Sequence, residues 1–166
     1  MSSSTAAVVL WLFVIFLGIA FGAGVYEHRI VVPRWISATA EPGGHWNAAA
    51  VRQDDTGTRF WAFVTTAPLT LLTLINLWAA WRAQSSLRMW WLIAAVAALA
   101  DRVFTFGYFI PTMVELMNAA DTPQSVAAAT RWSTLNYLRH AIVLTAWLAA
   151  LRTFALFYQQ RAVTSL

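Results

Sequence analysis

The sequence predicts an all-α fold: a polytopic membrane protein built as a four-transmembrane-helix bundle with a long loop between helices 1 and 2. Charged residues make up 11% of the 166-residue chain and hydrophobic residues 60%, whereas a soluble domain carries roughly 25% charged residues. Four apolar stretches each reach the ~20 residues that cross a bilayer as a helix. They lie at about 5–32, 60–81, 89–110 and 132–158. We therefore expect residues 1–166 to form a single transmembrane domain.

The composition excludes several classes of protein. The chain has no cysteine, so it has no disulfide framework, no thiolate metal site and no cysteine nucleophile. All 11 basic residues are arginines, and they are scattered singly, which is not the pattern of a nucleic-acid-binding protein. We expect an integral protein of a bacterial inner membrane. Its expected partners are membrane lipid and a hydrophobic small molecule.

The first stretch is expected to be a retained helix. Its leading residues carry no positive charge, and its apolar run exceeds the roughly 7–15 residues of a signal peptide. Gly18 and Gly22 form a GxxxG pair, which permits close helix approach. Pro33 is expected to end the helix, because proline disfavours helical geometry in the preceding residue. Glu27 and His28 then lie roughly 7–9 Å inside that end, at 1.5 Å per residue.

The loop at 34–59 is the most polar part of the chain. The turn sequence Pro42-Gly43-Gly44 precedes His45. Residues 37–40 and 48–53 are candidates for short interfacial helices. A loop of this length in so small a domain is either functional or a cap over another part of the protein.

The second and third stretches carry the signals of membrane helices. Pro68 predicts a kink, and Pro111 ends or bends the third helix, which 112–120 would continue as a bent extension. Arg82 and Arg88 flank a very short loop, which favours cytoplasmic termini by the positive-inside rule. An aromatic belt at the headgroup layer is predicted from four tryptophans, namely Trp78, Trp81, Trp90 and Trp91.

Polar residues recur on single faces of the last two helices. Asp101, Thr105 and Tyr108 share one face of the third helix, because their spacing follows the helical repeat. One face of the fourth helix carries Trp132, Asn136, Arg139 and His140.

Depth along the helices predicts where these groups meet. Measured from the side of the long loop, Glu27 lies ~7–9 Å deep. Arg139 and His140 lie ~10–12 Å deep, and Asp101 lies about 14 Å deep. Asn76 is ~24 Å from that side and cannot belong to the cluster. Ionisable residues inside a span are costly and usually face a partner or a cavity, so we expect one polar cluster in this half of the bundle.

Several interpretations of the cluster stay open. One is a buried salt-bridge network, although buried ion pairs are weak stabilisers. Another is the pocket of an oxidoreductase or oxygenase, because buried carboxylates and histidines suit general acid–base work. Its catalytic candidates are Glu27, Asp101 and His140. Its ligand-binding candidates are Arg139, Asn136, Arg102, Tyr108, Trp132 and His45.

Two further interpretations use other features. A transition metal or haem is a possible cofactor, because imidazole and carboxylate groups are suitable ligands. The candidate metal ligands are His28, His140 and Glu27. Alternatively, the protein is a non-catalytic scaffold or accessory subunit that uses the GxxxG surface to bind a second copy or a partner membrane subunit.

Four short motifs occur in order along nearly the whole chain. They are Gly22-Ala23-Gly24-Val25-Tyr26-Glu27, Pro33-Arg34-Trp35, Pro111 and Trp132-Ser133-Thr134-Leu135-Asn136-Tyr137-Leu138-Arg139. In these motifs the chain resembles the anthrone-oxygenase-like family of small four-helix membrane proteins, most of which have unknown function. The resemblance implies an α-helical membrane bundle, and some fungal members of the family are similar to oxygenases that convert anthrones to anthraquinones. It also implies that the Trp132, Asn136 and Arg139 face and the Glu27 region line the active site.

Overall fold

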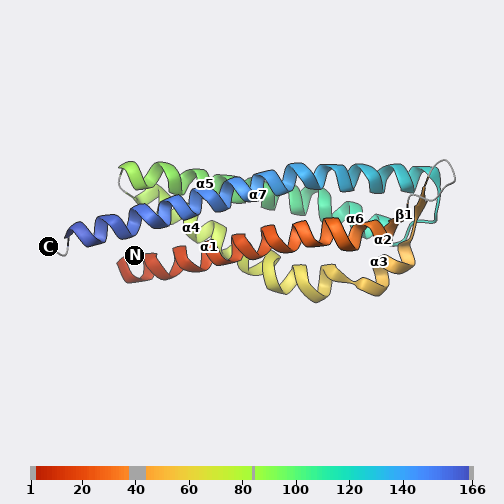
Figure 1. Ribbon diagram of the computed structural model, residues 1–166, viewed down its shortest axis with the longest axis horizontal. Coiled ribbons are helices and arrows are strands. Elements are labelled where there is room, and N and C mark those ends of the chain that lie inside the picture. The colour runs from red at the N-terminus through yellow and green to blue at the C-terminus, as the bar shows by residue number, and fades with distance from the viewer. Residues whose placement is uncertain (1–2, 38–43, 84, 165–166) are drawn as a thin grey trace.

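Four helical spans run side by side along the long axis of the molecule (Figure 1). The computed structural model describes residues 3–37, 44–83 and 85–164, and each span is long and apolar enough to cross a membrane. The spans are Ser4–Trp35, Gly57–Arg82, Leu87–Met117 and Pro123–Ala162. This confirms the predicted all-α bundle and the class of integral membrane protein. Both termini lie at one end, which we call the terminal end, and the opposite end is the loop end (Figure 1).

The spans combine α-helical and π-helical segments. The first consists of α1 (Ser3–Tyr26), η1 (Glu27–Val31) and α2 (Val32–Trp35), and the second of η2 (Gly57–Thr66) and α4 (Ala67–Arg82). The third consists of α5 (Ser85–Phe104), η3 (Thr105–Phe109) and α6 (Ile110–Met117), and the fourth is the single helix α7 (Pro123–Thr164). At the loop end, the helices extend past the predicted apolar stretches into polar residues.

Three prolines follow the π-helical segments instead of ending the helices. Pro33, Pro68 and Pro111 lie in the first turn of α2, α4 and α6. A proline inside an α-helix clashes with the carbonyl four residues back, whereas the N–H groups just before these prolines bond five residues back. Those bonds are Val32 to Glu27, Ala67 to Ala62 and Ile110 to Thr105. The wider turn accommodates the proline, so the prediction that Pro33 ends the first helix was wrong.

The long loop folds into a small structure at the loop end. Strands β1 (Ile36–Ser37) and β2 (His45–Trp46) pair antiparallel, a hairpin that the sequence did not predict. Helix α3 (Ala48–Asp54) confirms the short helix expected at 48–53, and its N-terminal amide of Ala50 donates to the Asn47 side chain. A short helix was also expected at 37–40, but Ser37 belongs to strand β1. Residues 38–40 lie outside the described part of the chain, as do Pro42 and Gly43.

The loop end has a hydrophobic core of its own. Indole rings anchor it: Trp46 Nε1 donates to the Leu116 carbonyl at 2.8 Å, and Trp35 Nε1 donates to Asp54 at 2.8 Å. The buried residues of this core are Val32, Trp35, Trp46, Val51, Phe109, Leu116, Ala129 and Trp132. We call this part of the molecule the cap. The remaining two cores lie within the bundle, around Phe13 and Leu10, so the predicted polar cluster falls between bundle and cap.

Candidate functional site

Three charged side chains meet inside the bundle where it joins the cap. Asp101 is 1% exposed and forms an ion pair with its neighbour Arg102, whose Nε donates to Oδ2 at 3.1 Å. Its other oxygen, Oδ1, lies 3.4 Å from Nε of Arg139. We call these three residues the buried charge cluster. It joins the third span to the fourth, as the depth argument predicted.

Glu27 is connected to the buried charge cluster through the ring of Trp61. Its Oε1 accepts hydrogen bonds from Thr56 Oγ1 at 2.6 Å and from Trp61 Nε1 at 2.8 Å. The Trp61 ring centre lies 5.6 Å from Cζ of Arg139, a cation–π contact. Residues of all four spans are therefore linked at this level. The role of Trp61 could not be predicted from the sequence, because a tryptophan inside an apolar stretch has no spacing that distinguishes a hydrogen-bond donor from an anchor.

The same level holds buried polar atoms without hydrogen-bond partners. Most buried polar atoms in proteins have such a partner. In the described part of this chain, the exceptions are His28 Nδ1, Asp101 Oδ1, Arg102 Nη1, Thr105 Oγ1 and Arg139 Nε. The facing atoms of Asp101 and Arg139 attract each other as an ion pair without hydrogen-bond geometry. The site thus retains free donors at Arg102 and Thr105 inside the membrane.

Two histidines from different spans lie beside the buried charge cluster. The rings of His28 and His140 meet edge to face, with centres 5.7 Å apart, and His28 also meets Tyr137 at 4.3 Å. The position of the His140 ring requires a glycine at residue 24, because a Cβ on Gly24 would lie 2.8 Å from Nε2 of His140. The structure therefore brings the predicted residues His28 and His140 together, and it adds Tyr137.

A groove of about 310 Å³ opens at these rings, between the first span and α7. We call it the histidine groove. Its lining residues are His28, Arg29, Val32, Pro33, Ile36, Thr130, Ser133, Thr134 and Tyr137. Aromatic, hydroxyl, basic and apolar groups thus face one space, a combination typical of small-molecule sites.

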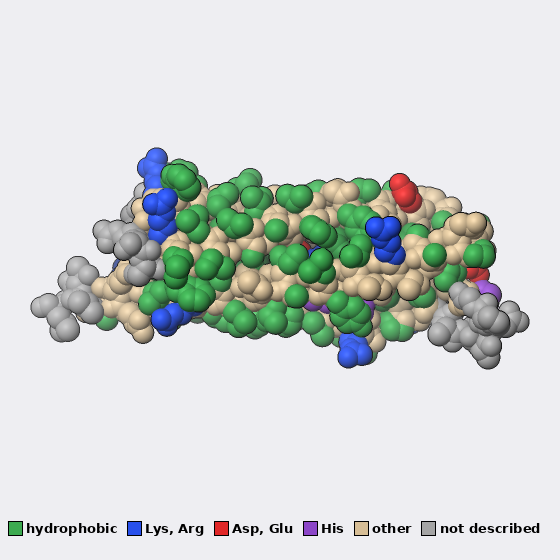
Figure 2. Space-filling view, turned by 90° about the horizontal axis from the view of Figure 1, so that it is seen from above, with side chains coloured by type: hydrophobic (Ala, Val, Ile, Leu, Met, Phe, Trp, Pro, Cys, Tyr) green, Lys and Arg blue, Asp and Glu red, His purple; other side chains and the backbone are tan. Residues whose placement is uncertain are grey.

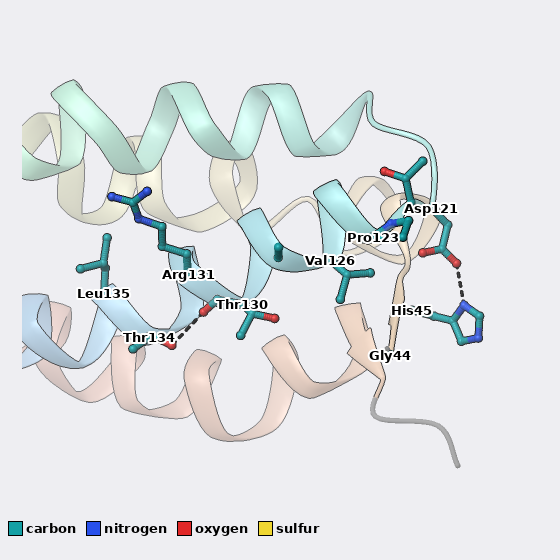
Figure 3. A pocket seen from close by; sticks show the side chains of 11 residues that line it. Gly44, His45, Asp121, Pro123, Val126, Thr130, Arg131, Thr134 and Leu135 are labelled. Atoms are coloured by element: carbon teal, nitrogen blue, oxygen red, sulfur yellow. Dashed lines mark hydrogen bonds and ion pairs between the residues drawn. The ribbon is translucent and has the colours of Figure 1, made fainter. Parts of the chain in front are cut away.

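A second hollow of about 780 Å³ adjoins the histidine groove, because Thr130 and Thr134 line both. Figure 3 shows these two threonines projecting from α7 toward the first span, with His45 and Asp121 at the outer end. The His45 ring pairs with Asp121 at 2.7 Å. The hydrogen bond from the Trp46 backbone N–H, and a second with His45, hold the pKa of Asp121 below its usual value of 3.8. The His45 side chain is exposed and lies at the surface of the cap.

Three of the predicted ligand-binding residues serve the protein itself. Asn136 donates to the Trp132 carbonyl of its own helix at 3.1 Å. Trp132 donates to the Phe109 carbonyl at 3.2 Å and is part of the cap core. Tyr108 packs edge to face on Phe109. The Trp132 hydrogen bond joins the third and fourth spans, the Asn136 bond stays within α7, and Tyr108 contributes ring packing. The histidine groove is lined instead by groups that include His28, Arg29 and Tyr137.

The predicted metal ligands do not form one site. Across the described residues, no group of three or more His, Asp or Glu side chains could hold a metal ion. Among the predicted ligands, Glu27 is hydrogen-bonded to Thr56 and Trp61. An axial haem ligand needs a ring nitrogen that faces open space. Nε2 of His140 packs against Gly24, so this nitrogen does not fit that role.

Comparisons of the chain with protein-family models, with curated proteins and with solved structures found no match.

Proposed function

We propose that this protein binds a hydrophobic aromatic or quinone-like molecule in the histidine groove and acts on it as a membrane oxidoreductase of the oxygenase type. The observation that carries the proposal is the position of the groove. His28 lines it and touches His140, which is adjacent in the chain to Arg139 of the buried charge cluster. A ligand in the groove is thus next to groups that can move protons.

The lining supports a ring-shaped ligand with oxygen substituents. The rings of His28 and Tyr137 offer aromatic surface, for which offset or edge-to-face contacts are favourable. Arg29 and the hydroxyl of Ser133 can donate hydrogen bonds to ligand oxygens, whereas the Thr134 hydroxyl already donates to the Thr130 carbonyl at 2.9 Å. Apolar residues of α2 complete the wall.

The chemistry follows from the ligand class. In an oxygenation of the anthrone type, a ring CH₂ and O₂ become a C=O and H₂O, and the step begins when a base removes a proton from the ring carbon. Histidine is the side chain best suited to accept that proton near neutral pH. We assign this role to His28, because it lines the groove. Arg29 then stabilises the ring oxyanion that forms.

Binding can be tested with the protein in lipid nanodiscs. Anthraquinone should quench tryptophan fluorescence saturably, and His28→Ala or Tyr137→Ala should weaken the apparent affinity at least tenfold. Tyr158→Ala is the matched control, because Tyr158 pairs with Trp11 at the terminal end. Turnover of an anthrone under O₂ should then fall in His28→Ala. No saturable binding, or equal losses in Tyr137→Ala and Tyr158→Ala, would overturn the proposal.

We also propose that the termini face the cytoplasm. The support is the short connection between Arg82 and Arg88, since arginines that flank short loops have the strongest influence on orientation. The chain has no cysteine, so single-cysteine variants report position without background. A cysteine replacing Arg82 should resist a membrane-impermeant maleimide in intact cells, and one replacing Arg52 should react. The reverse pattern would show the opposite orientation.

A further inference from the structure

We propose that the terminal end binds the headgroups of anionic phospholipids. This inference concerns a surface far from the histidine groove and does not depend on the proposed function. Four arginines lie at this end of the bundle, and we call them the arginine collar: Arg82, Arg88, Arg152 and Arg161. Figure 2 shows basic side chains gathered there, with no acidic side chain near them on that face.

The sequence explains why the collar is not neutralised by acids. The seven acidic residues of the chain are Glu27, Glu41, Asp54, Asp55, Asp101, Glu115 and Asp121. None belongs to the segments that form the terminal end. Phosphate groups of lipids are the anions that a membrane offers at this depth.

Aromatic rings hold the collar at the depth of the headgroups. Cζ of Arg82 lies 4.6 Å from the Trp78 ring centre, and Cζ of Arg88 lies 4.9 Å from that of Trp81. Such cation–π contacts restrict the guanidinium group without neutralising its charge. Exposed tryptophans mark the interface between hydrocarbon and headgroups, so these arginines face the phosphate layer.

The loop end provides the contrast, because three of its arginines have partners within the protein. Arg34 pairs with Asp54 at 3.4 Å, and Arg59 lies 3.9 Å from Asp55. Arg52 donates to the Met117 carbonyl. Only the terminal end therefore combines arginines with a lack of acids, and an anionic lipid gains about fivefold in affinity for each arginine near its headgroup.

The exposed tryptophans supply the measurement. Among the described tryptophans, Trp11, Trp78 and Trp81 are the well exposed ones, at 50%, 46% and 67%, and all three lie at the terminal end. Bromine on a lipid chain quenches tryptophans that the lipid contacts. Quenching by brominated phosphatidylglycerol, compared with brominated phosphatidylcholine at equal mole fraction, therefore reports the lipid preference of this end.

Two quadruple variants form a matched pair with equal changes in net charge. The first replaces the collar (Arg82, Arg88, Arg152 and Arg161) by glutamine, and the second replaces the loop-end arginines (Arg34, Arg52, Arg59 and Arg131) by glutamine. The wild-type protein should prefer phosphatidylglycerol severalfold. The collar variant should lose this preference, and the loop-end variant should keep it.

Salt supplies a test that needs no variant. The wild-type preference should shrink when the salt concentration rises from 0.05 to about 1 M, because exposed charges are screened over about 3 Å at 1 M salt. Equal quenching by both brominated lipids in the wild-type protein would overturn the proposal. So would a preference that survives in the collar variant, or that is lost equally in both variants.

Discussion

Asp101 is the residue on which the interior of the bundle depends. Among the described residues, it is the one acid in direct contact with two buried guanidinium groups, those of Arg102 and Arg139. Attraction within buried ion pairs roughly balances the cost of desolvation, so the cluster contributes little net stability when complete. The situation changes when one partner is removed, because the remaining charges are then uncompensated within the membrane.

Asp101→Asn should therefore destabilise the protein by about 3–5 kcal/mol, as breaking a buried pair does. The expected readout is a clear drop in the melting temperature of the protein in mild detergent. Glu115→Gln is the matched control, because it removes an exposed acid by the same chemical change and should alter stability by about 0.5 kcal/mol or less. Equal effects of the two substitutions would contradict the assignment of Asp101.

The glycines of α1 show which face of that helix packs against the rest of the bundle. A Cβ on Gly24 would lie 2.8 Å from the His140 ring, whereas a Cβ on Gly22 would meet nothing within 4 Å. Gly18, the partner of Gly22 in the GxxxG pair, packs on Trp147 inside the bundle. The pair therefore does not act as one contact surface within this chain.

Gly24→Ala should displace the His140 ring and cost about 1–3 kcal/mol, the range for overpacking a filled site. Gly22→Ala should be neutral or stabilising, because alanine is the better helix former. Thermal unfolding of both variants checks the difference. If Gly22→Ala were the more harmful, Gly22 would have to pack against something other than its own bundle.

At the scale of elements, the three π-helical segments position the site. η1 and η3 contribute Glu27 and Thr105, and η2 contributes Trp61. π-helical turns occur frequently at functional sites, and here each one also precedes a proline in the next helix. The wide turns thus allow the spans to stay helical while their polar groups turn toward one another.

The hairpin of the cap should respond to acid through Asp121. Hydrogen bonds from Trp46 and with His45 lower the pKa of Asp121 in the folded protein. The stabilisation they provide is present above the usual value of 3.8 and is lost as the pH falls through the lower, folded pKa. Hydrogen exchange at the Trp46 amide should accelerate, relative to the intrinsic rate, below pH 4. In Asp121→Asn this acid-dependent step should be absent, and its persistence would assign it to another group.

At the scale of the whole molecule, the sequence predicted what hydrophobicity and helical repeat determine. Four spans, the common side of the termini and the similar depth of Glu27, Asp101 and Arg139 in one half of the bundle follow from span length and depth alone. The β-hairpin could not be predicted, because each strand has only two residues. The hydrogen bond of Trp61 and the use of Asn136 and Trp132 within the protein depend on neighbours that no spacing reveals.

The proposed binding of a hydrophobic ring-shaped ligand between the first span and α7, beside the buried charges, can be tested by photo-crosslinking. An anthraquinone, itself photoreactive, would be irradiated with the protein in nanodiscs, and the adducts mapped by mass spectrometry. If the ligand binds in the histidine groove, the labels should fall on residues 28–36 and 130–137, and an excess of a competing aromatic ligand without a photoreactive carbonyl should suppress them. Labels that are not suppressed by the competitor, or that fall on the terminal half of the bundle, would contradict it.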